Sequence, residues 1–503
     1  MALGRAFSVA VLGLDGQIVE IEADITSGLP GVHLVGLPDA ALQESRDRVR
    51  AAITNYNNKW PMSRLTLALS PATLPKMGSV YDLALAAAVL SAQRKKPWRQ
   101  LESVVVLGEL ALDGRVRPVR GVLPAVLAAK RAGWEVAVVP VENLPEASLV
   151  DGIEVWGVRT LAQFLGWLSG WAHLDERISA AVPEPEPPAD LADVVGQAQA
   201  RFAVEVAAAG SHHLMLTGPP GVGKTMLAQR LPGLLPPLSN GESLEVTAIH
   251  SVAGLLSDAT PLITRPPFVA PHHSSSVAAL VGGGSGMARP GAVSRAHRGV
   301  LFLDECAEIG VSALEALRTP LEEGEIRLAR RDGVACYPAR FQLVLAANPC
   351  PCAPADPQDC ICAAAVKRRY LGRLSGPLLD RVDLRVEMHP VRMSVFANSE
   401  PESTGEVRRR VTVARDAAAQ RWRAHGFRTN AEVNGTLLRR RFRLGNAAME
   451  PLRTALDRGV LSIRGLDRTL RVAWTLSDLT GRTSPGRDEV ATALSFRQPG
   501  SSR

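Results

Sequence analysis

Residues 218–225 read Gly-Pro-Pro-Gly-Val-Gly-Lys-Thr and stand between an apolar run at 213–217 and a helix-like segment at 226–231. This order is typical of a phosphate-binding loop, because glycines let backbone N–H groups turn toward phosphate and a helix N-terminus adds partial positive charge. Lys224 is then expected to contact the β- and γ-phosphates, and the Thr225 hydroxyl to bind Mg²⁺. The pattern predicts an α/β nucleotide-binding fold whose loop consists of Gly218, Pro219, Pro220, Gly221, Val222, Gly223, Lys224 and Thr225.

A second motif, at 299–305, is a buried-strand pattern that ends in two carboxylates. We expect Asp304 to bind Mg²⁺, and Glu305 to orient and activate an attacking water. Simple polarity at a strand end would give the same pair. Together with the loop at 218–225, the pair favours an enzyme that hydrolyses ATP or a related nucleotide.

Length and composition indicate several domains. A chain of 503 residues with 46% apolar residues should form about three or four domains, each with its own core. No uninterrupted apolar stretch is long enough to cross a bilayer, and the first residues lack the basic start and cleavage site of a secretory signal. We therefore expect a cytoplasmic protein with no membrane partner.

Two breaks divide the chain. Residues 181–190 are rich in proline and acid, which predicts a stiff linker because proline removes backbone donors, and residues 397–405 are loose and polar. Strand patterns at 104–107 and 136–139 enclose a helix at 123–132, and a later helix is expected between Ser462 as its cap and Gly481 as its stop. The predicted organisation is an α/β domain at 1–175, a linker at 176–190, a nucleotide-binding domain at 191–395, a linker at 396–406 and a helical domain at 407–497.

Basic residues are concentrated near the C-terminus. The net charge is +7, yet residues 397–503 alone hold 20 arginines and no lysine against 11 acidic residues. This asymmetry fits attraction to nucleic acid, and it fits an arginine-rich solvated helix face equally well.

The order of four motifs resembles that of a known family. These are the loop at 218–225, the strand and carboxylates at 301–305, a strand and asparagine at 343–348, and Leu-Leu-Asp-Arg-Val-Asp at 378–383. The order resembles AAA+ ATPases of the magnesium-chelatase-like, helix-2-insert group. With its N-terminal domain, and with Ala-Pro-His-His-Ser at 270–274 and Ala-Asn-Pro-Cys-Pro-Cys at 347–352, the whole chain is similar to the ComM (YifB) family of competence-associated ATPases.

The resemblance implies roles that spacing alone leaves open. Asn348 matches the sensor-1 asparagine, which reads the γ-phosphate. Arg381 matches the arginine finger that reaches the nucleotide of a neighbouring subunit, which implies a homohexameric ring. An ordinary ion pair of Arg381 with Asp380 or Asp383 is the alternative.

The lid arginine that contacts phosphate, known as sensor 2, is best matched by Arg464. Arg468 and Arg471 are the other candidates, and the two that do not contact phosphate are expected on an exposed helix face. There Asp467 and Arg471, four residues apart, can pair.

The N-terminal domain resembles the proteolytic domain of Lon proteases, a fold like that of ribosomal S5 domain 2. Lon-type cleavage needs a serine nucleophile and a lysine base, but an ungapped match places Val80 and Leu123 at those positions. A shifted dyad of Ser79 and Lys76 is the alternative. We expect a non-catalytic platform for assembly or partner binding.

Residues 322–338 contain two short strand patterns around Asp-Gly, which predict a β-hairpin. It resembles the hairpin before sensor 1 in helix-2-insert ATPases, which projects into the channel of the ring. Arg330 and Arg331 would then lie at its tip, where they could contact a DNA backbone. An exposed turn with ordinary charges is the alternative.

Four cysteines lie in two close pairs, Cys350 with Cys352 and Cys360 with Cys362. Four thiolates can hold a tetrahedral Zn²⁺; a reducible disulfide pair or free thiols are the alternatives. The adjacent His272 and His273 are expected to bond to backbone and to bind no metal.

Two functions of different classes remain. The resemblance to ComM implies an ATP-driven hexameric DNA motor, a helicase or branch-migration enzyme that acts on recombination intermediates of any sequence. A chelatase-type ATPase that remodels a protein partner shares the core motifs, although the chain lacks the Asp-x-Ser-x-Ser metal site of such partners. Stimulation by DNA would favour the first, and stimulation only by a protein would favour the second.

Overall fold

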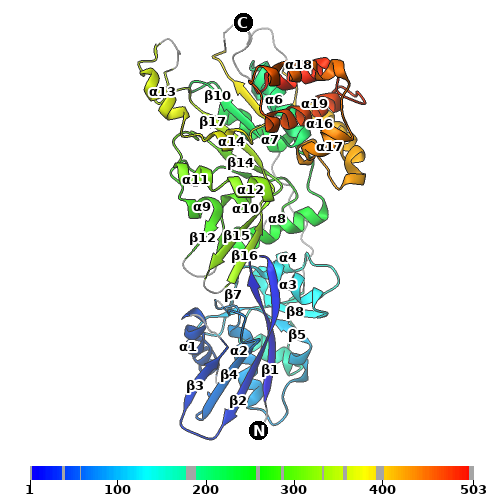
Figure 1. The fold of residues 1–503 in the computed structure, drawn as a ribbon. Coiled ribbons are helices and arrows are strands. Elements are labelled where there is room, and N and C mark those ends of the chain that lie inside the picture. Colours follow the sequence, from blue (N-terminus) through cyan, green and yellow to red (C-terminus); the bar gives the residue numbers. More distant parts are fainter. Residues whose placement is uncertain are drawn as a thin grey trace.

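The computed structural model describes residues 3–36, 40–56, 58–76, 78–176, 189–256, 261–284, 288–330, 333–354, 359–391 and 401–497. The elongated molecule has the N-terminal domain at one end, a second α/β domain in the middle and a helical region beside the far end (Figure 1). Residues 177–188 of the predicted linker at 176–190, and residues 396–400 of the predicted linker at 396–406, lie outside the described residues. In the described part, no helix is long and apolar enough to cross a membrane.

The N-terminal domain is built on a mixed seven-stranded sheet of order β3-β4-β2-β1-β5-β8-β9. The strands are β1 Gly4–Leu12, β2 Asp15–Thr26, β3 Gly31–Val35, β4 Arg64–Ser70, β5 Val104–Val106, β8 Val136–Pro140 and β9 Glu154–Val158, with the short β6 Glu109–Leu110 and β7 Val116–Arg117 beside them. The helices are α1 Ala40–Asn55, α2 Asp82–Ala92, α3 Val122–Arg131, α4 Leu144–Ala147 and α5 Leu161–Leu168. The predicted strands at 104–107 and 136–139 and the helix between them are thus present.

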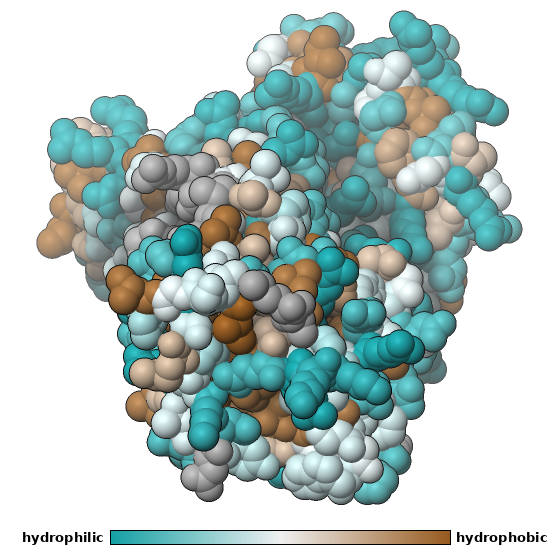
Figure 2. All heavy atoms as spheres, turned by 90° about the horizontal axis from the view of Figure 1, so that it is seen from below, coloured by the Kyte–Doolittle hydropathy of each residue, from teal (hydrophilic) through white to brown (hydrophobic). Residues whose placement is uncertain are grey.

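Helices cover both faces of this sheet, since one apolar cluster contains α2 and a second contains α3. Every residue of α2 is buried. Figure 2, seen from the end of this domain, mixes hydrophobic and hydrophilic side chains. Among the exposed apolar residues, Leu29 lies two residues before the edge strand β3, and Val35 is the last residue of that strand.

The middle domain holds a parallel five-stranded sheet of order β11-β14-β17-β10-β18. Its strands are β10 Leu214–Thr217, β11 Phe268–Val269, β14 Val300–Leu303, β17 Gln342–Ala347 and β18 Leu384–Glu387. The helices around it are α6 Ala198–Gly210, α7 Lys224–Leu234, α8 Asn240–Ala253, α9 Val277–Val281, α10 Ala292–Arg295, α11 Val311–Glu315, α12 Arg318–Glu323, α13 Ala364–Leu371 and α14 Gly376–Leu379. Because the strands are parallel, the loops that follow them meet at one edge of the sheet.

Two small antiparallel ribbons extend from this domain. The predicted hairpin is formed by β15 Glu325–Arg330 and β16 Gly333–Pro338, in a register that pairs Arg330 with Gly333. The second ribbon pairs β12 Gly282–Gly283 with β13 Arg289–Pro290. The side chain of Arg330 and the whole of Arg331 lie outside the described residues, so their predicted place at the tip stays a prediction.

The C-terminal region consists of α16 Thr404–Trp422, α17 Gly435–Arg440, α18 Asn446–Asp457, α19 Ile463–Leu479 and α20 Arg487–Ser495. The Ser462 side chain accepts a hydrogen bond from the backbone N–H of Gly465 and so caps α19. The helix ends at Leu479, and Gly481 follows with φ of +68°, as expected for a stop. These helices share one apolar core with α6 and β10.

The N-terminal domain touches the middle domain at two places. Helix α3 packs against α8, whose Ala248 and Leu244 join the apolar cluster of α3. The turn between β1 and β2 packs against the β15–β16 hairpin, and its Leu12 and Leu14 contact the cluster that contains Leu328 (Figure 1). The two domains are therefore held together by apolar packing as well as by the chain itself.

Candidate nucleotide-binding and hydrolysis site

The loop at 218–225 joins β10 to α7. Gly221 and Gly223 have φ of +79° and +93°, a left-handed conformation that favours glycine. Helix α7 begins at Lys224, so the loop ends directly at a helix N-terminus, where backbone N–H groups attract phosphate. The local geometry is therefore that of the predicted phosphate-binding loop.

Lys224 is folded back over this loop. Its Nζ donates to the carbonyl oxygens of Gly218 at 2.6 Å and Pro219 at 2.8 Å, and to Oδ1 of Asn348 at 3.0 Å. Burial lowers the pKa of the Lys224 ammonium, and the nearby Asp304 and Glu305 carboxylates oppose that shift. The lysine and the predicted sensor asparagine are thus brought together, because β10 and β17 are neighbours.

The residues expected to hold Mg²⁺ also meet. Thr225 Oγ1 donates to Asp304 Oδ2 at 2.7 Å, and Asp304 Oδ1 accepts from the backbone N–H of Glu305 at 2.9 Å. A hydroxyl and a carboxylate at this spacing are oxygen donors that suit Mg²⁺, which prefers one or two carboxylates together with substrate phosphate. The two side chains therefore fit the predicted metal.

Glu305 has an unusual backbone conformation for a residue other than glycine, with φ of +46°. Its Oε2 lies 3.2 Å from Nδ1 of His273, which follows β11 at the same edge of the sheet. The His272 ring lies 4.1 Å from the His273 ring, and its Nδ1 contacts Ser274 Oγ at 2.7 Å. The expectation of backbone-bonded histidines was therefore wrong for His273, because its partner is the carboxylate predicted to activate water.

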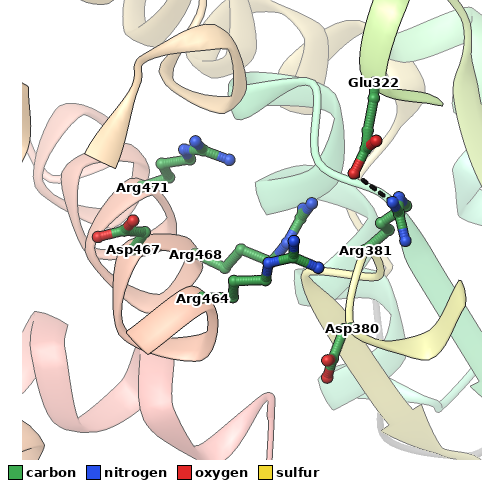
Figure 3. A pocket seen from close by; sticks show the side chains of 7 residues that line it. All are labelled: Glu322, Asp380, Arg381, Arg464, Asp467, Arg468 and Arg471. Carbon is green, nitrogen blue, oxygen red and sulfur yellow. Dashed lines mark hydrogen bonds and ion pairs between the residues drawn. The ribbon is translucent and has the colours of Figure 1, made fainter. Parts of the chain in front are cut away.

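A second polar centre is a pocket lined by Glu322, Asp380, Arg381, Arg464, Asp467, Arg468 and Arg471. Figure 3 shows Arg464 and Arg468 reaching from α19 toward Arg381, which follows α14. The lining includes four guanidinium groups and three carboxylates, and no residue of 218–225 or of the Asp304–Glu305 pair. The predicted finger and the sensor-2 candidates therefore share one pocket that is distinct from the phosphate-binding loop of the same chain.

The arginines of this pocket have different partners. Arg381 forms an ion pair with Glu322 from α12, and its buried Nε has no hydrogen-bond partner among the described atoms. The suggested pairing of Arg381 with Asp380 or Asp383 was therefore wrong. Arg464 is exposed and has no hydrogen-bond or ion-pair partner within the described residues.

The two other candidates are tied to the fold. Arg468 Nη1 lies 2.7 Å from Oδ1 of the buried Asp383, and Arg471 Nε donates to the carbonyl oxygen of Val433 at 2.7 Å. Asp467 pairs with Arg439, so the expected pair of Asp467 with Arg471 was wrong. Among the three candidates, Arg464 is the arginine that is free to meet a ligand.

The four-cysteine cluster follows Asn348 by a few residues. Its four Sγ atoms lie within 4.8 Å of one another. The Cys350–Cys352 and Cys350–Cys360 sulfur distances are 3.4 Å, and Cys352–Cys360 is 3.5 Å. A tetrahedron of Zn–S bonds of about 2.3 Å separates sulfurs by about 3.8 Å. The cluster can therefore hold a metal ion with little rearrangement.

The thiols of the cluster have unequal acidity. Burial raises the pKa of Cys350 to about 12. Hydrogen bonding, first from the backbone N–H of Cys362, lowers the pKa of Cys360 to about 6. All four are free thiols in this structure.

The N-terminal domain lacks a catalytic dyad at the aligned positions, since Val80 and Leu123 carry no reactive group. The shifted alternative does not form either: Ser79 donates to the Glu109 carboxylate, while the fully buried Lys76 donates to the carbonyl oxygen of Pro71. Burial lowers the pKa of Lys76, but the two groups have separate partners.

A phosphate-binding loop, a carboxylate pair and an asparagine that meet at one edge of a parallel sheet, with a helical region alongside, define an AAA+ type P-loop nucleotide-binding protein. Residues 190–396 match the family described as magnesium chelatase, subunit ChlI; residues 21–143 match subunit ChlI of Mg-chelatase; and residues 401–497 match its C-terminal family. The competence protein ComM of Haemophilus influenzae is 38% identical over 504 residues, which cover 99% of this chain and 98% of that protein. The chain belongs to the ComM/YifB family of magnesium-chelatase-like AAA+ proteins.

Two further relatives add detail. An uncharacterized protein of Mycobacterium tuberculosis is 82% identical over 503 residues, the full length of both chains. The Lon protease of Mycolicibacterium smegmatis is 29% identical over 189 residues, which cover 35% of this chain and 24% of that protein. The second likeness agrees with the Lon-like fold expected for the N-terminal domain.

The sequence reasoning missed two residues at these sites. His273 could have been found, because it follows β11 and the ends of parallel strands meet at one edge. No feature of the sequence indicated that Glu322 is the partner of Arg381, because 59 residues separate the two.

Proposed function

We propose that the protein is an ATP-hydrolysing DNA motor that works as a cytoplasmic homohexamer. The observation that carries the proposal is the contact of Lys224 with Asn348 beside the Thr225–Asp304 pair, because it brings together residues that were predicted to bind and hydrolyse a nucleotide. Bound Mg²⁺ would neutralise charge on the phosphates. Lys224 and the loop N–H groups would orient the phosphates, Glu305 would accept the proton of the attacking water, and Asn348 would help to position it.

We propose further that the basic pocket acts on the nucleotide of the adjacent subunit. The support is that Arg381 and Arg464 share a pocket whose lining contains no part of their own phosphate-binding loop. A guanidinium group supplied in this way stabilises the charge of the transferring phosphoryl group. Arg381 would have to exchange Glu322 for phosphate, whereas Arg464 has no described partner to give up.

DNA is proposed as the substrate on two grounds. A relative that covers nearly the whole chain is named a competence protein, and 20 arginines lie in residues 397–503. The β15–β16 hairpin would contact the phosphate backbone through Arg330 and Arg331, which are predicted to lie at its tip. Branch migration or helicase action, independent of sequence, is the activity that such contacts would serve.

Forked or four-way DNA is expected to raise the ATPase rate of the full chain. The rise should shrink steeply as salt increases from about 50 to about 200 mM, because phosphate contacts release counterions. Steady-state ATPase assays at several salt concentrations test this. No effect of any DNA, together with stimulation by a protein partner, would instead support a chelatase-type remodelling ATPase.

The cysteine cluster is proposed to bind Zn²⁺ and to tie the loop after Asn348 to α13. Protein purified without chelators should contain about one zinc per chain. The Cys360→Ser, Cys362→Ser double variant should lose it, whereas Cys336→Ser, outside the cluster, should keep it. Elemental analysis measures the content, and an unchanged zinc content in the double variant would exclude this site.

A further inference from the structure

Two separate segments of the C-terminal region bring exposed arginines together on its surface. We call this group the arginine patch, and it consists of Arg423, Arg440, Arg441 and Arg443. The first begins the short 3-10 helix Arg423–His425 after α16, and the others lie at the end of α17 and directly after it. The Phe442 ring joins the segments, because its centre lies 4.6 Å from that of Trp422 and 5.7 Å from that of His425.

An aromatic core fixes the backbone under the patch. Trp422 is fully buried, and Phe442 packs against the same core, with its ring centre 6.1 Å from that of Trp474. Arg441 and Arg443 flank Phe442 and are exposed. Because the ring between them is anchored, their guanidinium groups stay at the surface without a carboxylate to hold them.

The patch has no counter-charge within the described residues. None of its four guanidinium groups forms an ion pair or a side-chain hydrogen bond with another residue of that part of the chain. Two neighbouring arginines do have partners, since Arg428 pairs with Glu242 at 2.9 Å and Arg439 pairs with Asp467. The unpaired arginines therefore gather in one place, beside others that hold the fold together.

The surrounding sequence adds little negative charge. Residues 423–443 contain six arginines and a single carboxylate, Glu432. That carboxylate serves as a cap, because its Oε2 accepts from the backbone N–H groups of Arg428 at 2.8 Å and Thr429 at 3.0 Å. Uncompensated like charges repel one another, and a bound anion removes that cost. Stability alone does not explain four adjacent cations, whereas a polyanionic ligand does.

We propose that the arginine patch binds the phosphate backbone of duplex DNA. The proposal rests on the proposed function, because it gives the DNA motor a second contact with its substrate. A guanidinium group suits phosphate, since its planar donors can bond to two oxygens at once. Phosphates recur at regular intervals along a duplex, so several arginines of one patch can each meet one. Such contacts do not read base edges, and binding is independent of sequence.

The patch and the β15–β16 hairpin would contact DNA at different places. Figure 1 shows α17 at the outer edge of the C-terminal region, whereas the hairpin extends from the middle domain toward the N-terminal domain. A strand at the hairpin and a duplex arm at the patch would then belong to different parts of one branched molecule. The patch also shares no residue with the phosphate-binding loop or with the basic pocket, so it can be altered without touching either.

The test is a triple variant of the full-length protein, Arg440→Gln with Arg441→Gln and Arg443→Gln. Fluorescence anisotropy measures its binding to a duplex of about 30 base pairs, with a non-hydrolysable ATP analogue, at several salt concentrations. The slope of log affinity against log salt should fall by about 0.9 for each lost contact, or about 2.7 in all. At about 50 mM salt, Kd should rise at least about tenfold. The basal ATPase rate without DNA should not change.

Two controls separate the patch from charge in general. Lys95→Gln, Lys96→Gln and Arg99→Gln together remove the same charge from exposed positions of the N-terminal domain, and this variant should bind DNA like the wild type. Lysine at the three patch positions keeps the charge and should keep most of the slope. Equal losses in the two glutamine variants would show that only net charge attracts DNA and would overturn the proposal.

The remaining outcomes distinguish this proposal from the proposed function. If the wild type binds DNA and the patch variant binds it equally well, the patch is refuted and the DNA motor is not. If the wild type binds no DNA, both are refuted. Poly-glutamate is the comparison ligand: if the patch binds this acidic polypeptide and no DNA, its partner is a protein and the proposal is wrong.

Discussion

Replacing Glu305 with Gln is expected to lower ATP turnover by about 10²- to 10⁴-fold, the contribution of a positioned general base. Gln has the same size but cannot accept the proton of the attacking water. ATP binding should persist, because Lys224, Thr225 and Asp304 remain in place. Single-turnover hydrolysis and ATP-binding titrations separate the two effects.

The same substitution should stop ATP-dependent strand movement on forked and four-way DNA, because hydrolysis and motion are coupled in a motor. Glu308→Gln is the matched control, since Glu308 lies in the same loop but pairs with Arg373 at 2.9 Å. Strand movement that continued in Glu305→Gln at the wild-type rate would rule out the proposed mechanism.

Two inactive variants are expected to restore activity when their subunits are mixed. Arg381→Ala should lose about 10³-fold or more in turnover, the effect of removing an arginine finger. Lys224→Ala should lose ATP binding. In a mixed ring, a Lys224→Ala subunit can still supply Arg381 to a neighbour that retains its own phosphate-binding loop, so some interfaces become complete.

Turnover is measured as a function of the ratio in which the two variants are mixed. Turnover should be near zero for either variant alone and greatest near equal amounts, after subunit exchange. Arg318→Ala serves as the control and should stay active alone, because the half-exposed Arg318 of α12 pairs with Glu315 of α11 at 2.6 Å. If mixtures never exceed the separate variants, Arg381 acts within its own chain or not on the nucleotide at all.

Features set by residues close together in the sequence were the most predictable. Gly221 and Gly223 have the positive φ values that a phosphate-binding loop needs, Ser462 caps α19, and the two strands predicted around Asp-Gly are present as β15 and β16. Each depends on local backbone preferences that a short stretch of sequence specifies. The meeting of Thr225 with Asp304 was also predictable, because parallel strands place the loops that follow them at one edge.

The partners of the arginines were not predictable. From the sequence, Asp380 and Asp383 were the nearby carboxylates with which Arg381 could pair. In the structure Arg381 pairs with Glu322 instead. Asp383 pairs with Arg468, which lies 85 residues away in the sequence. Exposed pairs between neighbours are weak, so long-range packing decides which carboxylate a guanidinium meets. The contact of His273 with Glu305 also depends on long-range packing, so it was not predicted.

The turn between β1 and β2 limits how this protein can be dissected. Leu12 and Leu14 cover apolar surface beside the β15–β16 hairpin, and α3 covers Ala248 of α8. A fragment that starts at residue 189 would expose both patches to water and would tend to aggregate. Inactivity of such a truncated protein would then reflect poor solubility and would give no information about what the missing domain does.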